Sequence, residues 1–182
     1  MSHPAGTSTT TTGPLHAARL LTFAMGSSLV WIAVALYFVA PAEERWVMPE
    51  PWVVAVQLGI GALAYGLVTT VGFRTAPLPV GLAPEHATRE AVARFRSGMM
   101  LRLAFSEATA LVSVALMFLV EETSLVVYLV GAVISLVLLA YAAVPRAATI
   151  RRVEADLDRA GARSGLGEAL GIAGPPGHSP AK

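Results

Sequence analysis

One acidic residue inside a long apolar segment is the group in this sequence best placed to do chemistry. Residues 99–120 read MMLRLAFSEATALVSVALMFLV, with Glu107 near the middle. A charged side chain at the centre of a bilayer costs about 2.5 to 3.5 kcal/mol on insertion scales, so ionisable residues at that depth are rare unless they have a function. We therefore treat Glu107 as the candidate site.

An intramembrane carboxyl can exchange a proton or coordinate a monovalent cation. Burial disfavours the ionised form, so we expect a protonated Glu107 near neutral pH. Hydroxyls that could act as co-ligands are Ser106, Thr109, Tyr65 and Ser135. A structural interpretation competes with this one, because a protonated Glu can also hydrogen-bond across a helix interface and only hold helices together. The residues themselves leave both interpretations open.

The composition indicates a membrane protein. The chain has 182 residues, of which 55% are hydrophobic and 14% are charged, whereas about 25% of the residues in a soluble domain are charged. Crossing about 30 Å of hydrocarbon takes about 20 helical residues. Four segments are long and apolar enough, so we expect an all-α bundle of four transmembrane helices in the cell membrane, with spans at 20–39, 52–73, 99–120 and 125–144.

The first span could instead be the core of a signal peptide. Ala40-Pro41-Ala42, just after it, has the A-x-A form of a cleavage site. Signal-peptide cores contain about 7–15 apolar residues, and the apolar part here is longer. We therefore favour a membrane span.

The distribution of arginine predicts the orientation of the bundle. Arg45 is the one basic residue between the first two spans, and none lies between the last two, whereas the loop 74–97 contains four arginines. Because basic residues concentrate on the cytoplasmic side, we expect this loop and both termini in the cytoplasm. Arg102 lies near the cytoplasmic end of its span, and we expect its side chain to reach outward to the interface.

The segments outside the transmembrane domain, which we place at 15–145, differ in composition. Residues 1–14 are polar and Thr-rich, and residues 165–182 are rich in Gly and Pro, so we expect both to be disordered tails. Residues 146–164 carry many charges and a short apolar stripe. We expect a cytoplasmic amphipathic helix there.

Small residues follow one stripe of the second span, namely Ala55, Gly59, Ala62 and Gly66. Small side chains at this spacing let a neighbouring helix approach closely. We expect this stripe to be a helix-packing surface. Gln57 in the same span favours a structural interpretation, because polar side chains often bridge transmembrane helices.

The segment LRLAFSEATALVSVALMFL resembles the carboxylate-bearing helix of the c subunit, or proteolipid, of rotary ATP synthases. The preceding span resembles the glycine-rich helix of that family through Gly59, Gly61, Gly66 and Gly72. The resemblance covers about residues 57–119 and implies a helical hairpin with a cytoplasmic loop, in which Glu107 carries the ion. The chain departs from the family pattern in its longer loop without the Arg-Gln-Pro turn, and in the additional span on each side of the hairpin.

Other chemistries are not indicated. The chain has no cysteine, and its four histidines are scattered without ligand spacing. It contains no P-loop, nucleophile-elbow or H-E-x-x-H motif, and the basic residues are explained by topology and do not indicate nucleic-acid binding. We expect no enzyme activity, metal or cofactor.

Two functions remain. One is a proteolipid-like protein that exchanges a proton or cation within a homo-oligomer or larger membrane complex, since a single four-helix unit offers little room for a pathway. The other is a non-catalytic membrane scaffold or accessory subunit. In both, the lipid bilayer is a partner.

Overall fold

The fold is described by a computed structural model, which covers residues 14–120, 124–142 and 144–172. Every regular element within these residues is a helix, which confirms the predicted all-α class. In chain order the elements are α1 (Pro14–Val39), α2 (Pro51–Leu67), the π-helical turn η1 (Val68–Gly72), α3 (Pro84–Leu119), α4 (Leu125–Ala142), α5 (Ala147–Asp158) and α6 (Leu166–Ala169).

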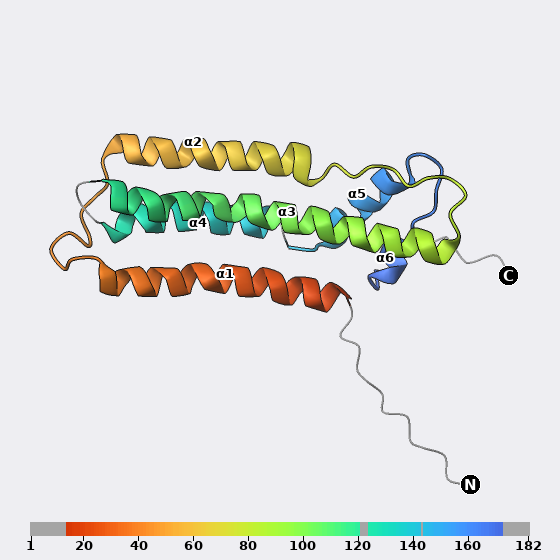
Figure 1. Ribbon diagram of the computed structural model, residues 1–182, viewed down its shortest axis with the longest axis horizontal. Coiled ribbons are helices and arrows are strands. Elements are labelled where there is room, and N and C mark those ends of the chain that lie inside the picture. The colour runs from red at the N-terminus through yellow and green to blue at the C-terminus, as the bar shows by residue number, and fades with distance from the viewer. Residues whose placement is uncertain (1–13, 121–123, 143, 173–182) are drawn as a thin grey trace, which may run out of the picture.

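Four of these helices are long and apolar enough to cross a membrane: α1, α2 with η1, α3 and α4. They run side by side, with α3 and α4 in the middle and α1 and α2 on opposite sides of that pair (Figure 1). The predicted spans 20–39, 52–73 and 125–144 coincide with α1, with α2 plus η1, and with α4, apart from a few residues at their ends. The predicted span 99–120 is only the second part of α3. Because α4 lies between the others, it is the most buried of the four.

Helix α3 is longer than the sequence predicts. The second half of the loop 74–97 and the expected span 99–120 form one continuous helix of 36 residues, which is about 54 Å long at 1.5 Å per residue. Gly98, between the two parts, does not break the helix. A bilayer core is only about 30 Å thick, so α3 is longer than a membrane span requires.

A small cap of helices and loop packs against the first part of α3. Its buried apolar core includes Leu78, Phe95, Ile150 and Leu157, and the Leu78 amide donates a hydrogen bond to the Leu157 carbonyl at 2.9 Å. The predicted amphipathic helix is α5, which ends at Asp158, earlier than expected.

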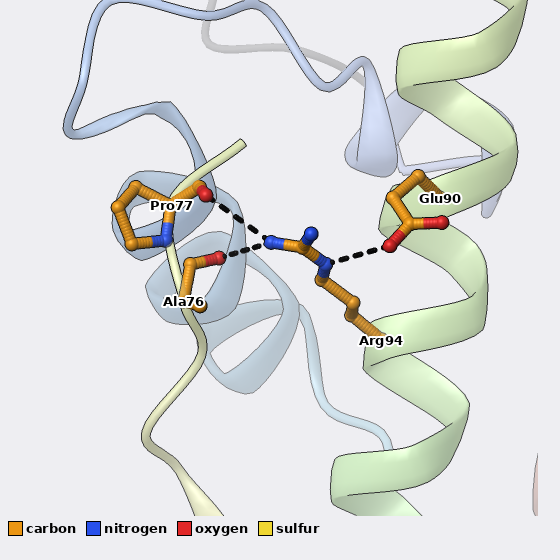
Figure 2. Close-up of polar contacts among 4 residues, drawn as sticks. All are labelled: Ala76, Pro77, Glu90 and Arg94. Atoms are coloured by element: carbon orange, nitrogen blue, oxygen red, sulfur yellow. Dashed lines mark hydrogen bonds and ion pairs between the residues drawn. The ribbon is translucent and has the colours of Figure 1, made fainter. Parts of the chain in front are cut away.

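The loop that leads into α3 is held against that helix by Arg94. Its guanidinium donates to the carbonyl oxygens of Ala76, at 2.6 Å, and Pro77, at 3.2 Å, while its Nε lies 3.0 Å from the Glu90 carboxylate. Figure 2 shows these contacts joining the loop to the helix. The cap is therefore fixed by polar contacts as well as by its apolar core.

Part of the predicted C-terminal tail is folded. Within it, α6 forms, and Leu166 and Leu170 are buried in the core of the cap. These two leucines lie on one helical face, and their burial outweighs the Gly-rich composition on which the prediction of disorder rested. The rest of that tail, most of the N-terminal tail and residues 121–123 lie outside the described residues.

Candidate functional site

Glu107 lies on α3 and is half-buried. Its Oε1 atom is shielded from solvent and has no hydrogen-bond partner. Glu107 therefore has one carboxyl oxygen that is buried and unsatisfied, although the residue as a whole is only half-buried.

The predicted co-ligands do not gather around Glu107. The Ser106 hydroxyl donates to the Arg102 carbonyl at 2.8 Å within the same helix. Thr109 is fully buried on the same face as Ser106, and its hydroxyl has no partner among the described residues. Tyr65 is 47% exposed on α2 and packs against Tyr141, with ring centroids 5.7 Å apart. None of these hydroxyls donates to the buried oxygen of Glu107.

A second polar feature of α3 was not predicted as a group. Four polar residues with successive spacings of four, three and four share its most buried face, each at most 2% exposed: Arg102, Ser106, Thr109 and Ser113. That spacing follows one face of a helix. The sequence therefore contains this polar stripe, but the prediction of the site relied on the single carboxylate of Glu107 and did not recognise the stripe as a group.

Gln57 of α2 joins this stripe to two other helices. Its amide nitrogen donates to the Ser113 hydroxyl at 2.8 Å and to the Val127 carbonyl of α4 at 2.5 Å, and Ser113 donates to the Thr109 carbonyl at 2.7 Å. Further along α4, the Ser135 hydroxyl accepts from the Ala110 amide of α3 at 2.9 Å. Hydrogen bonds thus link α2, α3 and α4, while the Gln57 Oε1 atom and the Thr109 hydroxyl stay buried without a partner in the described part of the chain.

Arg102 does not reach outward, which corrects the expectation for this residue. Its side chain is 2% exposed, and its Nη1 donates to the Gly72 carbonyl at the end of η1, at 3.0 Å. The last carbonyls of a helix lack partners within the helix and attract a cation. Room for the arginine exists because glycine stands at both neighbouring backbone positions, Gly72 and Gly98.

Within the chain, α2 does not use the predicted stripe for packing. Ala55, Gly59 and Ala62 are exposed, Gly66 is partly exposed, and a Cβ at either glycine would meet nothing within 4 Å. The face turned toward α3 and α4 contains Val53, Gln57, Gly61 and Ala64. This face also has small residues, and it alone lets the Gln57 amide find partners.

Neither a metal site nor a known relative helps to define the site. The described part of the chain has no group of three or more His, Cys, Asp or Glu side chains that could hold a metal ion. A cavity of about 330 Å³ lies where α2 and α4 begin, lined by residues such as Trp52 and Val127, and Glu107 does not line it.

Comparison of the chain with protein-family models, curated proteins and solved structures gave no match.

Proposed function

We propose that this chain is an integral protein of the cell membrane with four spans and cytoplasmic termini, in which Glu107 exchanges a proton. The proposal rests on one observation: the Glu107 Oε1 atom is buried beside apolar helices and has no hydrogen-bond partner. An unsatisfied carboxyl oxygen in an apolar surrounding is costly. Taking up a proton neutralises the group and removes most of that cost.

A proton fits the surroundings of Glu107 better than a metal cation. A bound cation needs several oxygen ligands, but Tyr65 of α2 is exposed beside Tyr141 and no described hydroxyl is hydrogen-bonded to the Glu107 Oε1 atom. Proton exchange needs only the carboxyl itself and occasional access to water. Of the two ions expected at Glu107, a proton or a monovalent cation, we therefore propose the proton.

The proton would pass at a contact between chains. Glu107 is half-buried at the surface of the four-helix unit, and the resemblance to the c subunit implies an oligomer in which the carboxyl meets another subunit. The outward small-residue stripe of α2, with Gly59 and Gly66, would let a second helix approach closely. A homo-oligomer or a larger membrane complex is thus part of the proposal.

A scaffold is the second candidate, and a specific observation favours it. The Gln57 amide nitrogen donates both to the Ser113 hydroxyl and to the Val127 carbonyl, which joins three helices of one chain and stabilises a bundle without any transport. Under this alternative, Glu107 forms a hydrogen bond to a partner helix in an assembly. Its proton would then not exchange.

Labelling with a hydrophobic carbodiimide tests the proposal, because this reagent modifies protonated carboxyls in apolar surroundings. We expect Glu107 in membranes to be labelled at pH 7 and labelling to fall as the pH rises, with the site mapped by mass spectrometry. Glu107→Gln should abolish the labelling, and Glu90→Gln, which changes an exposed glutamate, should leave it intact. Absence of labelling at every pH would reject proton exchange.

The same variant separates the two candidates. Proton uptake into vesicles containing the purified protein should be lost in Glu107→Gln if the carboxyl exchanges a proton. Gln keeps the shape and can still hydrogen-bond, so the free energy of unfolding should change by less than about 1 kcal/mol. Unchanged proton uptake together with a weakened oligomer would favour the scaffold.

A further inference from the structure

Two arginines from different helices lie against the same aromatic ring at the end of α2. The guanidinium carbon of Arg102 is 4.6 Å from the centroid of Phe73, and that of Arg152, on α5, is 4.8 Å from it. Phe73 is itself only 7% exposed. We call these three residues the arginine–phenylalanine cluster.

The cluster has an excess of positive charge. Neither guanidinium lies within 4 Å of a carboxylate of the described residues, whose ion pairs are Arg89 with Glu85 and Arg94 with Glu90. The two positive charges lie against one ring and repel each other, and Arg102 is buried away from water. Removing a cation from water is costly unless an opposite charge compensates it. An anion at the cluster would supply that compensation.

Of the two cations, Arg152 is placed to make the contact. Its side chain is on an exposed position of α5, so its donors can reach a ligand. Arg102 is buried, one of its donors is bonded to Gly72, and its Nε has no partner. Arg102 therefore adds positive charge behind the ring and acts as a positioning residue.

The position of the cluster points to a phosphate group carried by a lipid. Guanidinium groups match phosphate oxygens with paired hydrogen bonds, and basic sites between transmembrane helices bind anionic headgroups. Exposed apolar side chains continue along α2 and into η1 as far as Val71, which is 45% exposed and two residues before Phe73. An acyl chain could follow that surface, whereas a free phosphate would gain nothing from it.

We propose that the arginine–phenylalanine cluster binds the phosphate of an anionic phospholipid at the basic end of the bundle. Arg152 contacts the headgroup, Phe73 holds Arg152 in place, and Arg102 strengthens the attraction from within the protein. The proposal is independent of any proton exchange at Glu107.

Native mass spectrometry of the full chain in a neutral detergent tests the proposal with a matched pair of variants. Arg152→Gln removes the exposed cation over Phe73. Arg151→Gln removes an equal charge at the neighbouring exposed position, which is not part of the cluster and lines a cavity in the cap. We expect phosphatidylglycerol to be retained by the unchanged protein and by Arg151→Gln. Arg152→Gln should bind it about fivefold to tenfold more weakly.

Phosphatidylcholine and inorganic phosphate are the comparison ligands. Retention of phosphatidylglycerol well above phosphatidylcholine supports the site. If both variants bind phosphatidylglycerol equally weakly, the binding depends only on general surface charge, and the proposal is wrong. If inorganic phosphate displaces phosphatidylglycerol at equal concentration, the cluster is a site for a soluble anion, and the lipid assignment is wrong.

Discussion

Gly131 of α4 faces Ser113 of α3 where the Gln57 side chain joins three helices. A Cβ atom at position 131 would overlap the Ser113 side chain and lie 3.0 Å from the Thr109 carbonyl oxygen. The closeness of the two backbones lets one serine hydroxyl bond both to its own helix and to Gln57. One absent methyl group thus permits the polar contact between α2 and the central pair.

We predict that Gly131→Ala destabilises the protein by about 1–3 kcal/mol, the usual cost of overpacking a tight interior. The matched control is Gly26→Ala on α1, since a Cβ there would lie 3.5 Å from a Leu139 side-chain carbon, an ordinary contact distance. That variant should be unchanged or more stable by up to about 1 kcal/mol, because Ala favours helix over Gly. Unfolding of the purified protein in detergent would measure both, and equal effects would contradict the close contact of α3 and α4.

The π-helical turn η1 at the end of α2 depends on α3 for its closure. Its last carbonyl, that of Gly72, accepts from Arg102 across the helix contact. This carbonyl lies at a helix end, where a cation is favourable. The end of one long helix is therefore stabilised by a side chain of the next.

We predict that Gly72→Ala loosens this helix end. A Cβ at Gly72 would lie 2.7 Å from Arg102 Cγ, close to the backbone of that residue, so the arginine must shift away from the Gly72 carbonyl. Amide hydrogen exchange in η1 should become faster in this variant, while Gly26→Ala on α1, whose Cβ would make only an ordinary contact with Leu139, should leave the exchange unchanged. Unaltered exchange in Gly72→Ala would mean that Arg102 does not hold the end of α2.

For the helices, the sequence predicts which segments are helical better than it predicts which helix faces pack against one another. Hydropathy and length locate the four long helices, because a span needs a minimum number of apolar residues. Helix α2 has small residues on two faces, and only the partners of Gln57 in other helices decide which face turns inward. The position of Arg102 likewise depends on a carbonyl 30 residues away in the chain, which no local pattern encodes.

The candidate site was located by residue type and not by its surroundings. Glu107 stands out in the sequence because charge is rare in apolar helices. Which hydroxyls surround it depends on the rotation of α3 about its axis, and that rotation is fixed by the buried face with Ser106 and Ser113. Those residues turn toward α2 and α4, which leaves Glu107 at the edge of the bundle.

The whole molecule is asymmetric along the axis of the bundle. Arg45 is the one arginine of the described residues at the end where α1 leads into α2, and the others belong to the end with the cap. Trp46 and Trp52 are exposed at the first end, as is typical of residues at a membrane surface. Since α3 is about 54 Å long, its excess length lies at the capped, basic end.

This asymmetry predicts a cytoplasmic cap, because basic residues stay on the cytoplasmic side. The chain has no cysteine, so a single introduced thiol can be labelled without background. Met48→Cys, at a position 77% exposed, should react with a membrane-impermeant maleimide in intact cells. Val80→Cys, at a position 70% exposed, should react only after the membrane is opened.

The two exposed positions serve as controls for each other, since both thiols should react fully once the membrane is permeabilised. Reaction of Val80→Cys in intact cells, with Met48→Cys protected, would invert the orientation and place the basic cap outside. Reaction of both in intact cells would mean that the apolar helices do not separate the two ends across a bilayer. Only the expected pattern leaves the extended part of α3 and the arginine–phenylalanine cluster facing the cytoplasmic leaflet, where anionic lipids provide the negative surface potential.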